Sequence, residues 1–333
     1  MIGIFSISQG EVTTDEVIRW LHHHSARFKR VNADALINGK HKITFQYEAG
    51  ESRLLIDGID IDNIRVVWHR KWLYANSFMK EELDDLEIGN STAHRFKEGL
   101  LKEFSRICSV LFKKIARKPS LLSSQKAGVN KIHVIEVASR LGLKVPKTLI
   151  SNDIDGIEAF CENMPNGTIS KPVNEVLYFR EGQDLYSNYT HLLNSKELAD
   201  FIRELRFPSL FQEYIPKQYE LRVFYLAGQC YSMAIFSQND DQTKVDFRKY
   251  NDLYPNRTVP YQLPKEVESK INALMEELSL NTGSIDLLRA VNGEYYFLEV
   301  NPGGQLGMTS KPCNYHLEKR IAAYLIEMRN EVL

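Results

Sequence analysis

One β-hairpin near the C-terminus constrains this chain more than any other segment. Residues 281–305 read NTGSIDLLRAVNGEYYFLEVNPGGQ. Asn292-Gly293 is a two-residue turn signal between two apolar runs, so we expect these runs to pair antiparallel. Counting back from the turn places Asp286 opposite Glu299, with Asn301 two residues further along the same face, because side chains alternate along a strand.

These three side chains end in oxygen atoms, which are the ligands that a hard cation such as Mg²⁺ takes when it is shared with phosphate groups. Pro302-Gly303-Gly304 follows them and ends the strand. The sequence therefore predicts a magnesium site at the mouth of this hairpin. An ordinary hairpin with solvated polar ends fits the same residues, since short acidic patterns are common by chance.

Length and charge narrow the class of protein. A chain of 333 residues can form two or three domains. Its 42 basic and 43 acidic side chains almost cancel, so no overall field attracts nucleic acid or an anionic membrane, and we expect neither as a partner. No apolar stretch is long enough to span a bilayer. The cysteines are scattered and form no CxxC pair, which predicts reduced thiols in a cytoplasmic protein: Cys108, Cys161, Cys230 and Cys313.

The first 120 residues predict an N-terminal α/β domain. A buried strand from Ile2 to Ile7 precedes a helical pattern from Thr14 to Phe28, which Thr13, Thr14 or Asp15 would cap. Further strands are expected from Leu54 to Ile56 and from Ile64 to Trp68. The βα order at the start is typical of an α/β domain.

Two clusters in this region have alternative interpretations. His22-His23-His24 lies within the predicted helix, where consecutive side chains point in different directions, so we expect a helix surface and not a metal site. Trp68 to Trp72 reads WHRKW at a strand end. It fits either a rim that receives an acidic substrate or a surface of snorkelling cations.

Two further domains are expected, at residues 121–207 and 208–333. A long helical pattern from Ser91 to Lys118 ends at Pro119 and a serine-rich turn, Ser120 to Gln125, so a boundary falls near residue 120. The remaining expected elements are helices over 131–141, 195–205, 265–278 and 315–331, strands over 145–150, 167–172 and 211–215, hairpins over 176–190 and 221–237, and a proline-bounded loop over 254–264.

Several residues in these two domains have side chains or backbone groups that suit the binding of a nucleotide. Lys131 at a helix start and Lys171 at a strand end are point charges matched to phosphate oxygens, although each alone also fits a surface lysine. Residues 212–215 offer backbone donors and acceptors beside an apolar wall, as an adenine ring requires, and also fit a plain strand end. Glu220 and Arg222 share a strand face, and Arg248 supplies a second arginine that can offset charge on a transferred phosphoryl group. The chain contains neither GxxxxGK[ST] nor GxGxxG.

The ordered set of two lysines, QEYI, ELRV, DFR, a strand aspartate and LEVNPGG resembles the ATP-grasp carboxylate ligases. The resemblance implies an ATP-grasp fold with an N-terminal pre-ATP-grasp α/β domain, a central lid domain and a C-terminal ATP-grasp domain, and it implies ATP and Mg²⁺ as cofactors. The phosphates would be held by Lys131 and Lys171. The nucleotide would be received by Gln212, Glu213, Tyr214, Ile215 and Glu220. The metal would be bound by Asp286, Glu299 and Asn301. The acylphosphate would be steadied by Arg222 and Arg248.

Within that superfamily the chain looks most like the microviridin or graspetide peptide maturases, particularly those of grasp-with-spasm systems. Residues 171–184 read KPVNEVLYFREGQD and lack the glycine-rich loop that covers the phosphates in glutamate ligases. In the peptide maturases the corresponding hairpin helps to bind a precursor leader. The resemblance implies macrocyclic ester or amide formation on a ribosomal precursor peptide, with a homodimer and a SPASM-domain protein as further partners. The alternatives are a ligase that adds amino acids to a protein terminus or small molecule, and a nucleotide-binding regulator without turnover.

Overall fold

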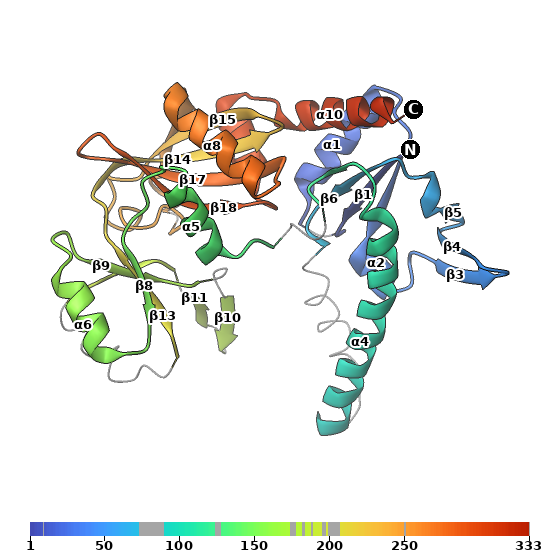
Figure 1. The fold of residues 1–333 in the computed structure, drawn as a ribbon, viewed down its shortest axis with the longest axis horizontal. Coiled ribbons are helices and arrows are strands. Elements are labelled where there is room, and N and C mark those ends of the chain that lie inside the picture. Colours follow the sequence, from blue (N-terminus) through green and yellow to red (C-terminus); the bar gives the residue numbers. More distant parts are fainter. Residues whose placement is uncertain are drawn as a thin grey trace. The chain divides into compact units, whose positions relative to one another are not determined.

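The chain forms two compact units in a computed structural model that describes residues 1–8, 10–72, 90–123, 128–173, 178–181, 184–187, 189–194, 198, 207–249 and 251–332. The first unit contains Met1–Gly128, Leu280–Thr282 and Pro302–Leu333, and the second contains Val129–Ser279 and Gly283–Asn301. The chain therefore begins in the first unit and then forms the second unit. It returns to the first unit at the end of the hairpin that carries Asp286 and Glu299 (Figure 1). The predicted mixed α/β class is confirmed. The predicted domain boundaries at residues 120 and 207 stay predictions.

The first unit is built on a parallel sheet of strand order β2-β1-β6-β7. These strands are β1 (Ile2–Ser6), β2 (Phe28–Asn32), β6 (Val66–His69) and β7 (Ser120–Leu121). Every residue of β1 and β6 is buried, as expected for parallel strands that are covered on both faces. Helices α1 (Val12–His23) and α10 (Leu317–Glu331) contact each other, and α10 also contacts β1 and β6.

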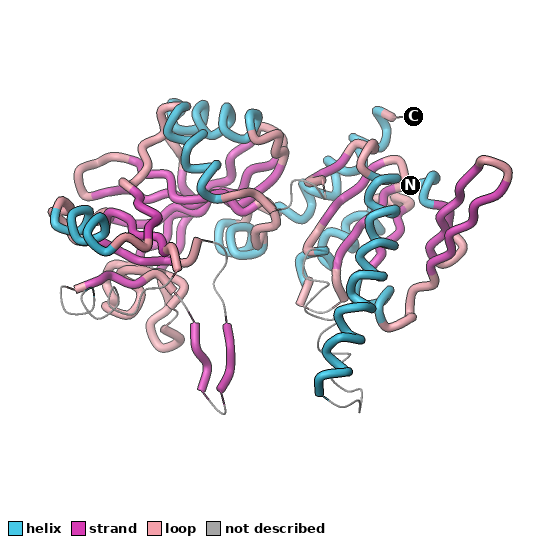
Figure 2. Tube along the Cα trace, turned by 60° about the horizontal axis from the view of Figure 1, so that its bottom comes forward, coloured by secondary structure: helices cyan, strands magenta, loops and turns pink. Residues whose placement is uncertain are grey.

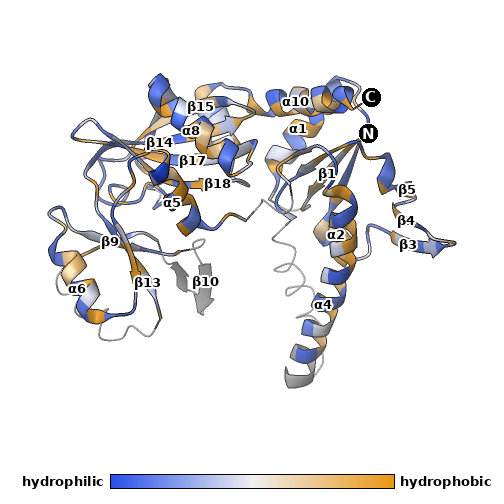
Figure 3. Ribbon diagram, in the orientation of Figure 1, coloured by the Kyte–Doolittle hydropathy of each residue, from blue (hydrophilic) through white to orange (hydrophobic). Residues whose placement is uncertain are grey.

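Helix α4 (Asn90–Ile115) contributes the other half of this core. Its buried residues Cys108, Leu111 and Ile115 pack in one cluster with Phe5 and Val67 of the sheet. Figure 3 shows hydrophilic and hydrophobic residues alternating around α4, which is the pattern of a helix with one face on a core and the other in water. Strands β6 and β7 pair in parallel, with Val67 beside Ser120, so the helix also serves as the crossover between them.

The predicted first helix was wrong at both ends. It begins at Val12 after Glu11, and no side chain caps it. The Thr14 hydroxyl donates 2.6 Å to Glu11 Oε2 and is no cap. The predicted C-terminal end, Phe28, belongs to strand β2, because the segment after the helix alternates in a way that helical periodicity hides. His22 and His23 are exposed in the last turn and His24 follows it, as predicted for a helix surface.

A second, three-stranded antiparallel sheet extends this unit. Its order is β3-β4-β5, with β3 (Ile43–Glu48), β4 (Glu51–Ile56) and β5 (Ile59–Asp60). The strand predicted at Leu54 to Ile56 is the end of β4, whereas β3 was not predicted. Short elements complete the unit: α2 (Ala33–Ile37), the 3-10 helix η1 (Ile61–Asn63) and α9 (Gly307–Cys313). The last helix, α10, begins at Leu317, so its predicted start at Tyr315 was two residues early. Helix α9 precedes it.

The second unit combines two antiparallel sheets. The smaller has order β12-β9-β13-β8. Its strands are β8 (Thr148–Ser151), β9 (Thr168–Lys171), β12 (His191–Leu193) and β13 (Ser209–Glu213). One face of it packs through Phe211 against Ile157 of helix α6 (Ile154–Glu162). The opposite face carries Ile169, Lys171 and Gln212, because these alternate with Phe211 and Ser170 in the paired register.

The larger sheet has order β16-β15-β14-β17-β18. Its strands are β14 (Lys217–Leu226), β15 (Gln229–Phe236), β16 (Arg257–Tyr261), β17 (Thr282–Ala290) and β18 (Tyr295–Asn301). Helix α5 (Lys131–Arg140) contacts β18, and helix α8 (Lys265–Glu277) leads into β17. The region 254–264, predicted to be loop, contains the edge strand β16. Pro260 obscured it, and proline is tolerated at a sheet edge.

A separate hairpin, β10 (Tyr178–Glu181) with β11 (Asp184–Ser187), confirms the hairpin predicted after Lys171. Its two strands can be followed side by side in Figure 2. The predicted helix over 195–205 and part of the serine-rich turn at 120–125 lie outside the described residues. Among the residues that the structure describes, no helix has both the length and the apolar character needed to cross a membrane.

Candidate active site

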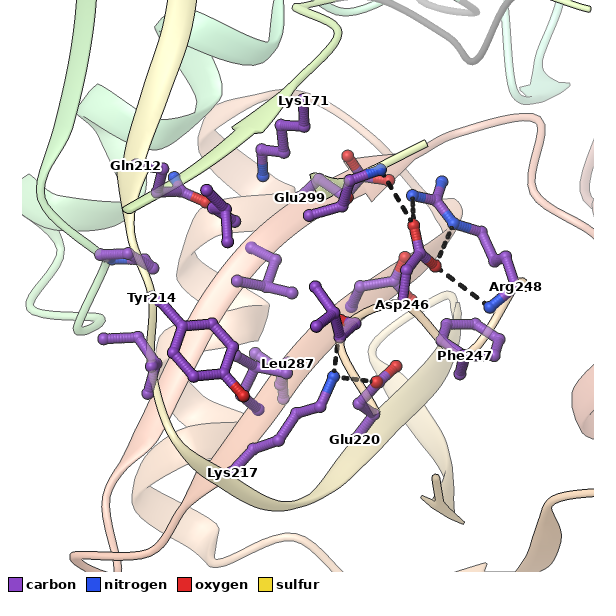
Figure 4. Close-up of a pocket in the computed structure, with 18 of the residues that line it drawn as sticks. Lys171, Gln212, Tyr214, Lys217, Glu220, Asp246, Phe247, Arg248, Leu287 and Glu299 are labelled. Carbon is purple, nitrogen blue, oxygen red and sulfur yellow. Dashed lines mark hydrogen bonds and ion pairs between the residues drawn. The ribbon is translucent and has the colours of Figure 1, made fainter. Parts of the chain in front are cut away.

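A cavity in the second unit gathers most of the residues predicted to bind nucleotide. It encloses about 800 Å³, its open mouth included, and is lined by both sheets (Figure 4). The predicted residues among its lining are Lys171, Gln212, Glu213, Tyr214, Ile215, Glu220, Arg248, Asp286 and Glu299.

The connection between the two sheets forms one wall. Residues 212–215 leave β13 just before β14 begins, so we call them the hinge. The backbone of Glu213 donates to the carbonyl of Lys147, and that of Tyr214 donates to the carbonyl of Gly167. Gln212 is only 1% exposed, and its Nε2 donates to Thr148 Oγ1 at 2.8 Å, whereas its buried Oε1 has no partner among the described residues. The hinge therefore has a fixed course and one buried acceptor that the described part of the chain leaves unsatisfied.

Apolar side chains surround this wall. Ile215 packs with Leu288 and Ala290 of β17, and half-buried Leu298 of β18 joins the same cluster. Ile169 lines the cavity from the smaller sheet. A flat slot with an apolar floor and backbone polar groups along one edge is what an aromatic base requires.

Deeper in the cavity, Glu220 is paired with Lys217 and accepts a hydrogen bond from Ser237 Oγ at 3.2 Å. Both members of the pair are buried, at 7% exposure each. Burial raises the pKa of Glu220 to about 7, and Lys217 offsets only part of that effect. Glu220 therefore changes its charge within the physiological range of pH.

In the hairpin of β17 and β18, Asp286 lies directly opposite Glu299, as predicted, and Ser284 lies opposite Asn301. The pairs nearer the turn, such as Leu287 with Phe297, are one residue away from the register that a two-residue turn gives. A bulge follows Asp286, which tilts the strand where its carboxylate faces the cavity. Arg222 Nη1 donates to both carboxylate oxygens of Asp286 at 2.6 Å. Burial nevertheless raises the pKa of Asp286, because Arg222 offsets only part of it and the nearby Glu299 adds to it.

Glu299 is held by cations from two other elements. Lys131 Nζ, at the first residue of α5, lies 3.0 Å from Glu299 Oε2. Burial alone would raise the pKa of Glu299, but Lys131 and Lys171 outweigh it and keep that pKa below its usual range. Lys171 is itself desolvated, and burial lowers its pKa while Glu299 opposes the change. The two lysines and the β17–β18 hairpin thus converge on Glu299.

Asp246 and Arg248 complete the polar end of the cavity. Arg248 donates from Nε and Nη2 to the two oxygens of Asp246, at 2.8 and 2.7 Å. Asp246 is 5% exposed and also accepts from the backbone of Thr190 at 3.4 Å. Burial would raise its pKa, yet Arg248 keeps that pKa low. The guanidinium is therefore fixed in orientation at the cavity wall, as Figure 4 shows.

Three predicted residues lie beside this cavity and not in its wall. Arg222 reaches the site through its hydrogen bonds to Asp286. Lys131 lines a neighbouring apolar cavity that shares Lys171 and Glu299 with the first, and it reaches the site through its ion pair with Glu299. Asn301 lines neither cavity, although it follows Glu299 by two residues on the same strand and face.

Sequence reasoning assigned no role to Lys217 or Asp246, although both are central to the site. Lys217 follows Pro216 directly after the hinge, and nothing in a lone lysine there signals that it will be buried against Glu220. Asp246 sits two residues before Arg248, a spacing that lets a strand or turn aspartate orient an arginine, and this signal was available.

The structure contradicts both interpretations of the WHRKW segment in the first unit. His69 and Arg70 are buried, at 1% and 4% exposure. Arg70 Nε donates to Glu11 Oε2 at 3.1 Å, and its Nη1 donates to the carbonyls of Gly303 and Gly304 at 2.7 and 2.9 Å. The guanidinium is thus neither a rim for substrate nor a snorkelling surface group, because the protein itself occupies its donors.

Comparison with known proteins agrees with this geometry. The model of the RimK-like ATP-grasp domain matches residues 128–325, and no curated protein sequence matches the chain. The structure resembles the macrocyclase MdnC bound with precursor peptide MdnA from Microcystis aeruginosa, at 25% identity and a TM-score of 0.80, with 98% of this chain and 99% of MdnC covered.

Two further structures have the same fold. The Chryseobacterium gregarium RiPP-associated ATP-grasp ligase in complex with ADP and a leader and core peptide is 22% identical, with a TM-score of 0.83 over 98% of this chain and 96% of that one. The ATP-grasp ligase PsnB complexed with minimal precursor, Mg and ADP is 18% identical, with a TM-score of 0.77 over 98% and 97%. Because the family model spans more than half of its residues, the chain belongs to the RimK-like ATP-grasp family.

Proposed function

We propose that this protein uses Mg²⁺ and ATP to phosphorylate an Asp or Glu side chain of a ribosomal precursor peptide. A Ser, Thr or Lys side chain of the same peptide then attacks, which closes a macrocyclic ester or amide. The observation that carries the proposal is the meeting of Asp286 and Glu299 with two lysines and two arginines, at the polar end of a hinge-lined cavity.

In this proposal the cavity holds the nucleotide along its length. The adenine ring would be held by the hinge and the apolar wall, where Gln212 Oε1 is a buried acceptor with no partner among the described residues. Glu220 would bind the ribose. Lys171 and Lys131 would bind the phosphates, since their ammonium groups already converge on Glu299.

The residues at the hairpin fit a magnesium ion. Two carboxylates at directly paired positions repel each other, and the raised pKa of Asp286 reflects that repulsion together with burial. A divalent cation between Asp286, Glu299 and Asn301 removes this conflict with the oxygen ligands that Mg²⁺ prefers. When bound, it offsets the negative charge of the phosphates and of the transferred phosphoryl group.

The side chains of the protein position and stabilise the reacting groups. The peptide carboxylate attacks the γ-phosphorus of ATP, ADP leaves, and an acylphosphate forms. The peptide hydroxyl or amine then attacks the acyl carbon, and phosphate leaves with one oxygen of the original carboxylate. Arg222 and Arg248 neutralise the phosphoryl oxygens, and Asp246 holds Arg248 in orientation. The peptide supplies the nucleophile, so the protein needs none.

A precursor peptide as the substrate is supported by the neighbours, since MdnC, PsnB and the Chryseobacterium ligase were each solved with precursor or leader and core peptides. The β10–β11 hairpin offers two strands for a leader. To test the function, the purified protein is incubated with Mg²⁺, ATP and a synthetic copy of the short Ser/Thr/Lys and Asp/Glu-rich peptide encoded beside its gene. Each ring closed should lower the peptide mass by one water. ADP release with an unchanged peptide mass would contradict macrocyclisation.

A second candidate is an amino-acid ligase that extends a protein terminus or a small molecule, which the RimK-like family match favours. The same experiment separates the two, because that activity raises the acceptor mass. We further propose a cytoplasmic location and a SPASM-domain pathway partner.

A further inference from the structure

We propose that the first unit contains a second ligand site, which binds a free basic amino acid such as arginine. The site is a cavity of about 1090 Å³, its open mouth included, and we call it the α1–α10 cavity. Its walls come from α1, α9, α10 and the turn between the last two helices, all of which belong to the first unit. Helices α1 and α10 contact each other (Figure 1). The inference is independent of the catalytic proposal, because this cavity contains none of the nucleotide-site residues.

Helical spacing and a tight turn build the walls of this cavity. Glu16 and Arg19 lie three residues apart in α1, so their side chains share one face of the helix. A second wall is the turn between α9 and α10, which contains two residues with left-handed backbone, Asn314 and His316. This turn brings Ser310 to the start of α10, where its Oγ accepts a hydrogen bond from a backbone N–H at 3.0 Å. One face of α1 and the first turn of α10 therefore line the same cavity.

Glu318, in the first turn of α10, is a buried carboxylate that the described part of the chain satisfies on one side only. It is 8% exposed and lines the cavity. Its Oε2 accepts from Ser310 Oγ at 2.6 Å, whereas its buried Oε1 has no hydrogen-bond partner among the described residues, and none of their cations forms an ion pair with it. A buried carboxylate without a cation is unfavourable. A ligand that brings N–H donors and a positive charge removes both deficits.

Glu16 supplies a second oxygen of this kind from α1. Lys311 Nζ lies 3.0 Å from Glu16 Oε1, whereas Glu16 Oε2 is buried without a partner in the described ranges. Each of the two carboxylates thus offers the cavity one oxygen that lacks a donor. No three His, Cys, Asp or Glu side chains among the described residues are placed to hold a metal ion, so N–H donors match these oxygens better. A guanidinium carries five N–H donors in a planar fork and can serve two carboxylates at once.

The remaining charges of the cavity select a ligand that carries both signs. Arg19 is exposed at the wall and forms no ion pair with any residue that the structure describes. The charges of Arg19 and Lys311 balance those of Glu16 and Glu318, so a zwitterion keeps the cavity neutral. Its cationic end would bind the two carboxylates, and its own carboxylate would bind Arg19. Half-buried Trp20 adds an apolar surface for a methylene stem between these ends. A free basic amino acid has this arrangement of groups.

Calorimetric titration of the full-length protein with L-arginine tests the site, and one equivalent should bind. Citrulline has the same shape without the positive charge, so it should bind at least about tenfold more weakly. Agmatine lacks the carboxylate, and N-acetyl-L-arginine amide represents an arginine within a peptide; both should also bind more weakly than arginine. No binding at millimolar L-arginine, or equal affinity for citrulline, would overturn the proposal. An amide that binds as tightly as arginine would show that the site takes a peptide side chain, which contradicts a free amino acid as the ligand.

Three variants locate the ligand within the cavity. Glu318→Gln removes the buried charge and should weaken arginine binding by about tenfold or more. Glu327→Gln is the matched control, because Glu327 is an exposed residue of the same helix outside the cavity, and it should bind arginine like the wild type. Arg19→Gln changes an exposed side chain, so the fold should melt normally; it should weaken the binding of arginine and leave that of agmatine unchanged. Unchanged arginine binding in both Glu318→Gln and Arg19→Gln, or an equal loss of arginine and agmatine in Arg19→Gln, would refute the proposed site.

Discussion

Two buried clusters of charge lie in the two units, and they differ in what surrounds them. In the first unit, Glu11 is 2% exposed and is bound by Arg70, by Thr14 and by Lys71 at 2.6 Å. In the second unit, Asp286 and Glu299 are bound by Arg222 and Lys131. In the first cluster, Arg70 also donates to backbone carbonyls, whereas the second cluster faces a cavity of about 800 Å³.

The pKa values of the carboxyl groups also differ between the two clusters. Burial would raise the pKa of Glu11, but Arg70 and Lys71 outweigh it and lower that pKa. In the second unit burial raises the pKa of Glu220 to about 7 and raises that of Asp286, because their cations offset too little of the burial, whereas Lys131 and Lys171 keep the pKa of Glu299 low. A closed cluster is thus satisfied by the protein, and a site that takes a ligand is left partly unsatisfied.

The largest effect should come from Glu299→Gln. Loss of the charge removes a proposed metal ligand and the ion pair with Lys131, so ADP formation should fall by about three orders of magnitude. The melting temperature should stay close to that of the wild type, because the cavity leaves this side chain accessible to water. Turnover near the wild-type rate would remove Glu299 from the metal site.

The matched change in the first cluster is Arg70→Met, which keeps an unbranched apolar stem and removes the guanidinium. It leaves Glu11 with Lys71 as its cation and with the Thr14 hydroxyl. It also frees two backbone carbonyls, so the free energy of unfolding should fall by about 3 kcal/mol. Urea denaturation measures this. An equally stable variant would mean that Arg70 does not stabilise the first cluster. The contrast between a cluster satisfied by the protein and one that takes a ligand would then be wrong.

The pH dependence of two glutamine variants should have opposite signs. Glu11 has a lowered pKa, so its charge stabilises the fold above its unfolded-state pKa, and this contribution is lost as the pH falls through the folded-state value. Glu220 has a raised pKa, so the folded state binds more protons between about pH 4.5 and pH 7, and its contribution worsens as the pH rises through that range.

Relative to the wild type, Glu220→Gln should therefore gain about 1 kcal/mol or more between about pH 5 and pH 8, and Glu11→Gln should lose relative stability as the pH rises from acid values. Denaturation at a series of pH values measures both. Parallel profiles for the two variants would contradict the different electrostatics of the clusters. Lys217→Met serves as the control, because it should raise the pKa of Glu220 further.

The smallest effect is expected at the edge of the site. Asn301→Ala removes an amide oxygen that lines neither cavity, so the affinity for Mg²⁺ in the presence of ADP should weaken by about tenfold. Calorimetric titration with the metal provides the measurement. An unchanged affinity would leave Asp286 and Glu299 as the ligands and exclude Asn301.

Local sequence signals predicted the parts of the site that depend on neighbouring residues. The Asn292-Gly293 signal predicted the hairpin and the pairing of Asp286 with Glu299, although a bulge after Asp286, which the sequence did not indicate, is needed to produce that pairing. Asn130 caps α5, so Lys131 stands at the helix start. Such signals could not predict contacts between residues that are far apart in the sequence. Nothing near Arg70 indicates that its donors will meet Glu11 and Gly303, and β16 was hidden because a proline at a sheet edge resembles a loop.

The most direct test of the account follows an oxygen atom. A precursor peptide whose acidic side chains carry oxygen-18 is incubated with the protein, Mg²⁺ and ATP, and the released phosphate is analysed by mass spectrometry. Activation through an acylphosphate at Asp286, Glu299 and the two arginines predicts that each ring closed transfers one labelled oxygen to inorganic phosphate. Phosphate without the label, beside cyclised peptide, would contradict carboxylate phosphorylation at this site.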